Sequence, residues 1–310
     1  MTHEIIGNKR YNTFDNYLKA RFGCKVAKVS LNCAFGCPNR DGTKGIGGCI
    51  YCSPSGSGDF AGNPEKSVTE QFYEVKAGLD AKWHDAKYLP YFQAGTGTYA
   101  PVERLRALYY EALALPNIVG MSIATRPDCI PDDVLELLSE IAARTYLTVE
   151  LGLQTVHDKT GKLINRCTDY AEFLETYERL SERGINVCVH LINGLPGETR
   201  DMMLESVETV GKLRPHSVKL HMLHILKNTA AERMYYDGKI KVFELDEYVN
   251  LVCDELELLP YDTVVQRITG DGGRDTLVAP LWSVKKFDVM NGVDREMNRR
   301  RIFQGNKVDT

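Results

Sequence analysis

The sequence lacks a long apolar segment and a strong excess of charge of either sign. No apolar run approaches the about 18 residues that a helix needs to cross a bilayer, and the first ten residues contain no apolar stretch typical of a secretory signal. The formal net charge is only −4, which argues against a strongly basic nucleic-acid-binding protein. We therefore expect a soluble, cytoplasmic protein with no membrane partner.

Repeats and low-complexity segments are also absent. With 310 residues, of which 43% are hydrophobic, the chain can bury one large core, with at most a small appendage. The nine cysteines are an odd number in a chain without a secretory signal, which argues against a disulfide framework. The cysteines therefore indicate another kind of chemistry.

Three cysteines near the N-terminus have the most informative spacing. Cys37 is followed after eleven residues by Cys49, and Cys52 comes three positions later. Three thiolates can hold three irons of a [4Fe–4S] cluster and leave the fourth iron open to a ligand. The four glycines between Cys37 and Cys49 would let the loop wrap around a compact inorganic core.

A fourth cysteine keeps a second interpretation open. Cys33 lies four residues before Cys37, and the four cysteines together also match the spacing of a structural zinc site. Such a site would indicate a zinc-stabilised binding module rather than an enzyme. The cysteines alone do not decide between zinc and an iron–sulfur cluster.

Short runs of β-branched or aromatic residues alternate with amphipathic helical patterns. We expect six strands, at residues 26–31, 88–93, 118–124, 146–153, 185–192 and 217–225. Helices are expected between them at residues 65–83, 101–115, 131–144, 170–183 and 199–213. This alternation predicts a parallel sheet, because parallel neighbours need a crossover connection. A doubly wound sheet and an incomplete barrel both fit it.

Polar residues and glycines gather at the carboxyl ends of four expected strands. Barrel enzymes place their active sites on that rim, so the pattern favours an incomplete (β/α) barrel. Glu150 and Gln154 share one face of a strand, and Gly152 between them leaves room for a bound molecule. The competing interpretation is that these are ordinary polar residues at strand ends. For Arg126 it is an ion pair with Asp128 or Asp132.

The pattern changes after residue 242. A helix at 245–259, a strand at 264–269 and a long helix at 283–301 follow. We expect a core over residues 1–242 and a C-terminal α/β extension over residues 243–310 that packs on the barrel. Its last helix has a basic face that would suit an RNA backbone, unless nearby acidic residues neutralise it. The basic residues are Lys285, Lys286, Arg295, Arg299, Arg300 and Arg301.

Several motifs together resemble those of radical S-adenosylmethionine (SAM) enzymes. In the cluster motif of that superfamily an aromatic residue precedes the last cysteine, as Tyr51 precedes Cys52 here. The long cysteine spacing resembles the YhcC/YtqA-type subgroup, which is related to the radical-SAM domain of the Elongator catalytic subunit. The resemblance runs through residues 37–43, 91–94, 125–129, 150–155, 194–198 and 267–272.

Three places in the sequence depart from the subgroup pattern. Cys33 stands where a small non-cysteine residue is expected, and Cys167 and Thr168 replace a glycine and a histidine. Gly95 and Gly97 are smaller than the usual residues at their positions.

The resemblance implies a partial (β/α)6 radical-SAM barrel that holds a [4Fe–4S] cluster and SAM. Iron would be bound by Cys37, Cys49 and Cys52, with Cys33 a bystander. By the same resemblance, the SAM contacts would come from Tyr51, Gln93, Ala94, Gly95, Thr96, Arg126, Glu150, Gln154, Arg166, Gly194 and Pro196. No catalytic residue is assigned.

The resemblance also implies a function. A reductant such as flavodoxin or ferredoxin would supply an electron, and SAM would be cleaved to methionine and a 5′-deoxyadenosyl radical. The expected substrate is the wobble uridine of tRNA, with its carboxymethylaminomethyl side chain converted to aminomethyl. The alternatives are a small-molecule substrate and the zinc-stabilised binding module.

Overall fold

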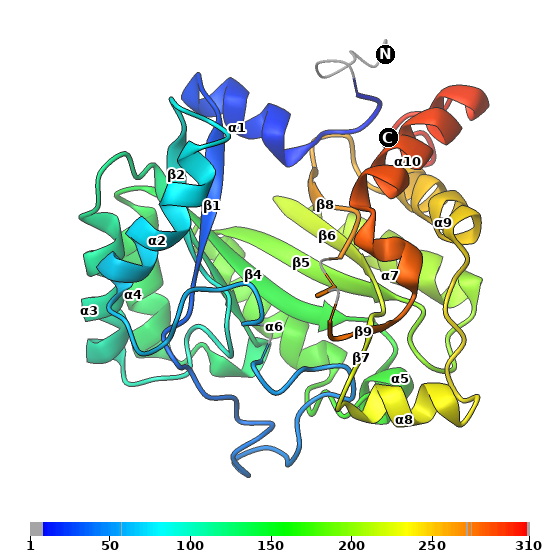
Figure 1. The fold of residues 1–310 in the computed structure, drawn as a ribbon, viewed down its shortest axis with the longest axis horizontal. Coiled ribbons are helices and arrows are strands. Elements are labelled where there is room, and N and C mark those ends of the chain that lie inside the picture. The colour runs from blue at the N-terminus through cyan, green and yellow to red at the C-terminus, as the bar shows by residue number, and fades with distance from the viewer. Residues whose placement is uncertain (1–8, 57, 271, 274, 309–310) are drawn as a thin grey trace.

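A seven-stranded parallel sheet, curled into part of a barrel, is the framework of the protein (Figure 1). The structure is a computed structural model that describes residues 9–56, 58–270, 272–273 and 275–308. The first eight residues, where no secretory signal is expected, lie outside this part. Across the sheet the strands are β1 (Val26–Leu31), β2 (Lys87–Phe92), β3 (Gly120–Thr125), β4 (Tyr146–Gln154), β5 (Asn186–Asn193), β6 (Ser217–Met222) and β8 (Val264–Arg267).

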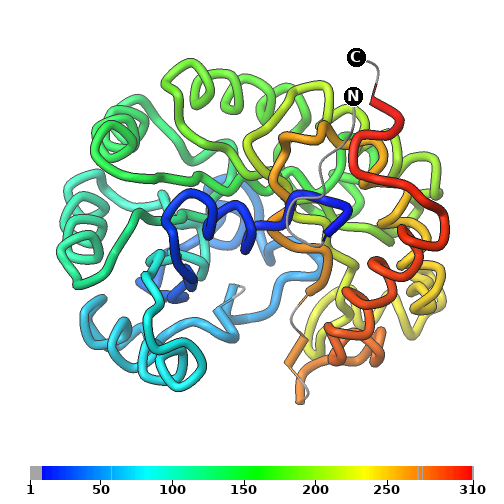
Figure 2. Tube along the Cα trace, turned by 90° about the horizontal axis from the view of Figure 1, so that it is seen from above, coloured from blue at the N-terminus to red at the C-terminus, as the bar shows by residue number. Residues whose placement is uncertain are grey.

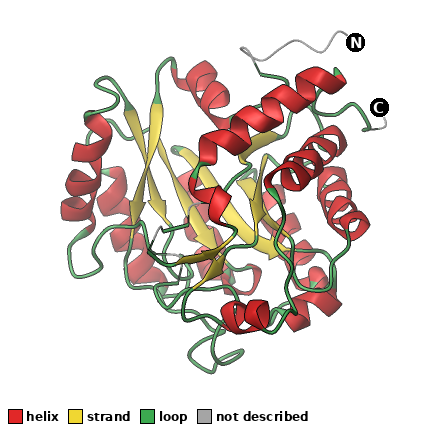
Figure 3. Ribbon diagram, turned by 45° about the vertical axis from the view of Figure 1, so that its right-hand side comes forward, coloured by secondary structure: helices red, strands yellow, loops and turns green. Residues whose placement is uncertain are grey.

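Helices cover the outer face of the sheet, and the long loops gather at its carboxyl end (Figure 3). The covering helices are α2 (Val68–Asp80), α3 (Val102–Leu113), α4 (Asp132–Ala142), α6 (Tyr170–Glu182) and α7 (Arg200–Lys212). Outward residues such as Val29, Val149 and Val189 are fully buried beneath this layer. The predicted partial barrel with alternating strands and helices is therefore confirmed.

The expected C-terminal extension shares the sheet with the core. Its strand β8 pairs in parallel with β6 and becomes the seventh strand. Helix α9 (Leu245–Leu258) packs against α7 and against α10 (Lys286–Arg300), while the short strands β7 (Ile225–Leu226) and β9 (Leu277–Ala279) pair with each other. A division of the chain at residue 242 stays a prediction.

Three helices were not expected from the sequence: α1 (Phe14–Phe22), α5 (Asp158–Leu163) and α8 (Ala230–Tyr236). The first is capped by Thr13, whose hydroxyl accepts a hydrogen bond from the Asn16 N–H. It contacts β1 and β8 and lies across the amino end of the barrel (Figure 2). This end of the barrel is therefore closed.

The concave face of the sheet is open towards the carboxyl end. Along β5 the inward residues His190 and Ile192 are partly exposed, while their outward neighbours Val189 and Leu191 are buried. Gly152 and His221 on the neighbouring strands are partly exposed as well. Because successive side chains of a strand point to opposite faces, this alternation marks a solvent-accessible inner surface.

Candidate functional site at the carboxyl end of the sheet

The loop after β1 brings three thiols close together. Burial raises the pKa of the Cys52 thiol to about 11, and the neighbouring Cys49 and Cys37 raise it too, against the opposing effect of Arg40. In the described part of the chain, only Glu150, Cys188 and His190 form a trio with ligand atoms within 4.8 Å of one another. The three sulfurs are therefore not all within 4.8 Å of one another, whereas the sulfurs of a tetrahedral zinc site lie roughly 3.8 Å apart. This spacing suits a cluster better than a single ion.

Nitrogen donors of the same loop point at the thiols. Arg40 Nη2 lies 3.0 Å from Cys52 Sγ, and the Arg40 guanidinium also donates to the carbonyl oxygens of Ser53 and Pro54. Asn39 Nδ2 lies 3.6 Å from Cys49 Sγ, and Asn39 is completely buried. Hydrogen bonds of this kind stabilise sulfur in its thiolate form, which is the form that binds iron.

Cys33 lies apart from these three cysteines. Its side chain belongs to the main hydrophobic core together with Phe35, and burial raises its pKa to about 12. Its electrostatic neighbours are Arg104 and Glu111 rather than the other thiols. The structure does not bring four cysteines together, so the four-cysteine zinc arrangement lacks its fourth ligand.

The predicted turn after β2 lies against the cysteine loop. The Gly95 N–H donates to Gly56 O at 2.8 Å, and the Thr96 N–H donates to Gly36 O at 3.0 Å. Gly95 has φ +69°, and a Cβ atom there would lie 2.2 Å from the carbonyl oxygen of Phe35. Only glycine meets both demands, so Gln93, Ala94, Gly95 and Thr96 are held beside Cys37.

The second predicted segment, after β5, meets the cysteine loop from the other side. Tyr51 packs against a small hydrophobic cluster that contains Ile50 and Leu195. Gly194 has φ +82°, and Pro196 is buried. The structure thus brings Tyr51, Gly194 and Pro196 into one region, as a shared binding site requires.

The two predicted arginines are already bound to protein groups. Arg126 donates two hydrogen bonds of 2.9 Å to Asp128, which is the ion pair considered as the competing interpretation, and a third to Arg166 O. Arg166 donates to the carbonyl oxygens of Leu153 and Thr155 at 2.6 Å. Both guanidinium groups therefore shape the end of β4 and the loop after it.

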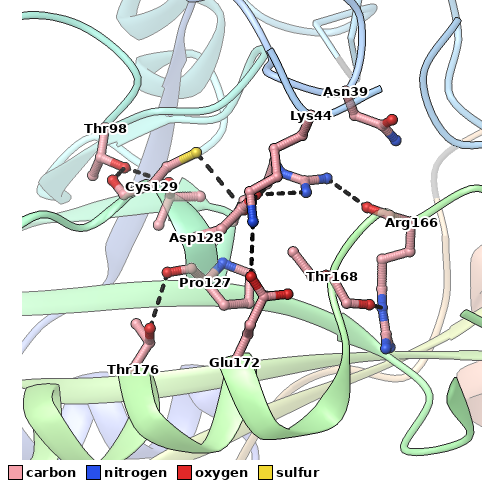
Figure 4. A network of polar contacts seen from close by, with 12 residues as sticks. Asn39, Lys44, Thr98, Pro127, Asp128, Cys129, Arg166, Thr168, Glu172 and Thr176 are labelled. Atoms are coloured by element: carbon pink, nitrogen blue, oxygen red, sulfur yellow. Dashed lines mark hydrogen bonds and ion pairs between the residues drawn. The ribbon is translucent and has the colours of Figure 1, made fainter. Parts of the chain in front are cut away.

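A cavity of about 740 Å³ lies outside the barrel, between the cysteine loop, the β3–α4 connection and α6. Lys44 crosses it and forms ion pairs with Asp128 and Glu172 (Figure 4). These contacts tie the cysteine loop to α6. The concave face of the sheet, rather than this cavity, carries the polar groups described next.

Glu150 lies at the bottom of the concave face and not on the rim. Strand β4 continues to Gln154, which has φ +70° at a β-bulge, so Glu150 falls in the middle of the strand. Its buried carboxylate forms ion pairs with Lys28 and Lys219. It also lies 2.9 Å from both Tyr91 OH and His190 Nε2. We call Lys28, Tyr91, Glu150, His190 and Lys219 the floor cluster.

Charge interactions within the floor cluster oppose the effects of burial. Burial would raise the pKa of Glu150, but the ammonium groups of Lys219 and Lys28 outweigh it and hold this pKa well below its usual value. Burial lowers the pKa of Lys219 to about 8 and that of His190 to about 4. At neutral pH, Glu150 is therefore ionised and His190 is neutral.

Sequence reasoning missed Lys28, Tyr91 and Lys219. A signal for the two lysines was present, because each is the single Lys, Arg, Asp or Glu residue in a short, largely buried strand. Each also stands at a position whose side chain points to the concave face of the sheet. Which strands lie opposite one another, and at what height, is visible only in the folded sheet.

Comparison with known proteins identifies the family. The model of the Radical SAM superfamily matches residues 31–210, and that of the Radical_SAM C-terminal domain matches residues 215–299. YtqA of Bacillus subtilis is 50% identical over 297 residues, which cover 96% of this chain and 92% of YtqA. A tRNA uridine(34) acetyltransferase of Methanocaldococcus infernus is 26% identical over 188 residues, 59% of this chain and 34% of that protein.

The fold is shared with a solved structure as well. Elp3 of Methanocaldococcus infernus superimposes with a TM-score of 0.69 at 16% identity, covering 90% of this chain and 64% of that chain. None of the helices in the described part of the chain combines the length and the apolar character that a membrane span needs. The chain belongs to the radical SAM superfamily, in the group of YtqA and YhcC, and its cofactors are a [4Fe–4S] cluster and S-adenosylmethionine.

Proposed function

We propose that this radical SAM enzyme acts on the wobble uridine of tRNA and converts its carboxymethylaminomethyl side chain into aminomethyl. Relatives support the choice of tRNA, since a distant one is named as a tRNA uridine(34) acetyltransferase. The observation that carries the proposal is the surface beside the gap between the two edge strands of the sheet. This surface has the chemistry of a site for single-stranded RNA.

This surface lies where the segments after the two edge strands, β1 and β8, meet. A pocket of about 330 Å³ is lined by Phe60 from the first segment and by Val284 and Lys286 from the second. Phe60 is 53% exposed and Phe287 is 67% exposed, which is unusual for aromatic side chains. We call Phe60, Val284, Lys285, Lys286 and Phe287 the mouth. Asp271, in the nearby segment that carries part of the family resemblance, lies outside the described residues.

The mouth fits RNA because its two kinds of side chain meet the two parts of a nucleotide. Exposed aromatic rings stack on unpaired bases, and lysines attract the phosphate backbone. The other end of α10 differs, because Arg299 and Arg300 are bound to Glu296, and Arg300 also to Asp254. Lys285 and Lys286, at the mouth, are exposed to solvent, so we take this end of the helix as the part that contacts RNA.

The cofactor residues are part of the proposal. We assign the cluster to the thiolates of Cys37, Cys49 and Cys52. The SAM site is assigned to Tyr51, the 93–96 turn, Gly194 and Pro196, with Gln154 at the end of β4. When bound, the reduced cluster and SAM together supply a 5′-deoxyadenosyl radical that removes a hydrogen atom from the substrate. The protein orients the thiolates through Asn39 and Arg40.

The overall conversion balances with water as the only further reactant. The carboxymethylaminomethyl side chain, SAM and water give the aminomethyl side chain, glyoxylate, methionine and 5′-deoxyadenosine. The methylene carbon between nitrogen and carboxylate is oxidised by two electrons, and the carbon–sulfur bond of SAM is reduced by two. A one-electron reductant such as flavodoxin or ferredoxin activates the enzyme, and we place the reaction in the cytoplasm.

The test is mass spectrometry of tRNA nucleosides from cells with and without the gene. Loss of the gene should increase carboxymethylaminomethyl-uridine and remove aminomethyl-uridine. The purified, reduced enzyme should form 5′-deoxyadenosine and glyoxylate in equal amounts with tRNA. Unchanged tRNA nucleosides would contradict the proposal and favour the alternative, a small-molecule substrate.

A further inference from the structure

The floor cluster has an uncompensated positive charge. Two ammonium groups, those of Lys28 and Lys219, share the single carboxylate of Glu150, and His190 is neutral. Within the described ranges, no other carboxylate forms an ion pair with either lysine. Lys219 is buried and Lys28 is partly exposed, and buried charges in proteins are normally paired, so an anion beside Lys219 would balance this surplus.

The register of the sheet separates the two lysines by height. Lys219 pairs with His190, and His190 pairs with Gly152. These three residues therefore form one layer, which lies nearer the carboxyl end of the sheet than Glu150 does. Lys28 lies at the closed side, where its ammonium donates to Gln266 Oε1 at 2.8 Å and packs over the Phe14 ring of α1. A ligand that enters from the carboxyl end therefore meets Lys219 first.

The layer that contains Lys219 has room and a free donor. A Cβ atom on Gly152 would lie 2.8 Å from the side-chain nitrogen of Gln154 and farther from every other atom, so only the end of one flexible side chain fills the space beside Gly152. The Lys219 ammonium has three N–H groups, and its acceptors among the described residues are Glu150 and Tyr91 OH, the latter at 3.1 Å. One N–H remains for a ligand, and the other two fix the direction in which it points.

We propose that Lys219, held by Glu150 and Tyr91, is the subsite for the carboxylate of the substrate side chain. This inference rests on the proposed function, which supplies a substrate with a carboxylate. The carboxylate would neutralise the surplus charge of the floor cluster. Binding at this depth places the oxidised methylene carbon above the floor, on the side of the concave face that opens to the cofactor site.

The test measures equilibrium binding of anticodon stem-loop RNAs to the cluster-containing protein with SAM. One RNA carries carboxymethylaminomethyl-uridine and the other carries methylaminomethyl-uridine, which lacks the carboxylate. The wild type should prefer the first RNA about tenfold to a hundredfold, the effect of one charge-assisted hydrogen bond. Lys219→Met should abolish this preference, and Lys219→Arg should keep part of it.

Lys28→Met is the matched control, because it removes the other ammonium that binds Glu150. It should weaken the preference for the carboxylated RNA less than Lys219→Met does, because Lys219 can still donate to the carboxylate, whereas a loss equal to that in Lys219→Met would overturn the assignment of Lys219. Equal binding of both RNAs by the wild type would overturn the carboxylate subsite alone. If neither RNA binds to the wild type, the proposed function itself fails.

Discussion

The two ends of the half-barrel are built on different principles. At the closed end, α1 packs over Tyr146 and His216, and the Tyr17 and His216 rings lie 5.2 Å apart. At the open end, the chain runs through turns such as those at Gly95 and Gly194, and buried Arg166 holds backbone carbonyls in place. The closed end therefore consists of packed aromatic rings, whereas the open end consists of tight turns that carry thiols and charged side chains.

The difference teaches which substitutions should change stability and which should change chemistry. Packed rings contribute hydrophobic burial, so their removal destabilises the fold without touching a ligand. We propose that the thiols, the Lys219 ammonium group and the exposed rings act in binding, so their removal should change binding more than stability. The following predictions test this contrast, from the largest expected effect to the smallest.

The largest effect is expected at the cysteine loop. Cys49→Ser should lose nearly all iron and the broad absorption near 400 nm that marks an iron–sulfur cluster, because one thiolate ligand is missing. Cys33→Ser is the control and should keep near-normal iron, since its thiol lies in the hydrophobic core. Iron analysis and absorption of anaerobically purified protein check both variants. Complete bleaching of Cys33→Ser would show that four cysteines bind the metal.

At the closed end, Tyr146→Ala should lower the free energy of unfolding by roughly 3 kcal/mol, as other aromatic-to-alanine changes in cores do. Tyr146 is buried and packs against Phe22 and His216. Denaturant unfolding measures the loss, and the preference for carboxylated RNA should remain. If Tyr146→Ala lost the preference for carboxylated RNA but kept the free energy of unfolding of the wild type, the proposed contrast between the two ends would be wrong.

The mouth should affect RNA affinity and leave the cofactors in place. Removing a ring that stacks on a base typically weakens binding about fivefold to 150-fold, so Phe60→Ala and Phe287→Ala should each fall in this range. Tyr236→Ala is the matched control, because Tyr236 is 71% exposed and belongs to α8, outside the mouth. Equal losses in all three variants would mean that the mouth has no special role.

Binding of the carboxylated RNA should weaken at alkaline pH. Burial lowers the pKa of Lys219 to about 8, so the ammonium is charged below this pH and loses its charge above it. The dissociation constant should rise by up to tenfold per pH unit above about pH 8. Binding of the RNA without the carboxylate should show no such rise. The charged and titratable groups around Lys219 include Lys28, Tyr91, Glu150, Cys188, His190, His221 and Arg267.

The smallest effect is expected at the far end of α10. Arg299 and Arg300 are paired with acidic side chains, so an Arg295/Arg299/Arg300→Ala variant should leave the salt dependence of tRNA binding unchanged. Lys285/Lys286→Ala should make that dependence shallower by about one unit per lost phosphate contact. A shallower slope in the arginine variant would place RNA along the whole helix.

Much of the fold could be predicted because its signals are local. The alternation of strands and helices is encoded in residue spacing, and it predicts a parallel sheet. The strand at Val264–Arg267 was found, but its place in the main sheet was not, because pairing with β6 is a long-range contact. Helix α1 was missed, because only one of its residues, Leu18, is buried and its apolar pattern is weak.

The candidate site divides in the same way. The cysteine loop and the turns at Gly95 and Gly194 were recognised from short motifs, and the structure brings them together. Glu150 was expected on the rim as a SAM contact, but the structure surrounds it with Lys28 and Lys219 at the floor. The position of a residue along a strand does not reveal which charges face it from other strands.

The sequence by itself indicated the cysteine loop, the parallel sheet and the family. Each of these depends on residue types at fixed, short spacings. Only the tertiary structure decided that Cys33 lies away from the other thiols and that Lys219 lies above Glu150. The physical reason is that hydrogen-bonded register and curvature set distances between strands that are far apart in the chain. Charge balance inside the barrel depends on those distances.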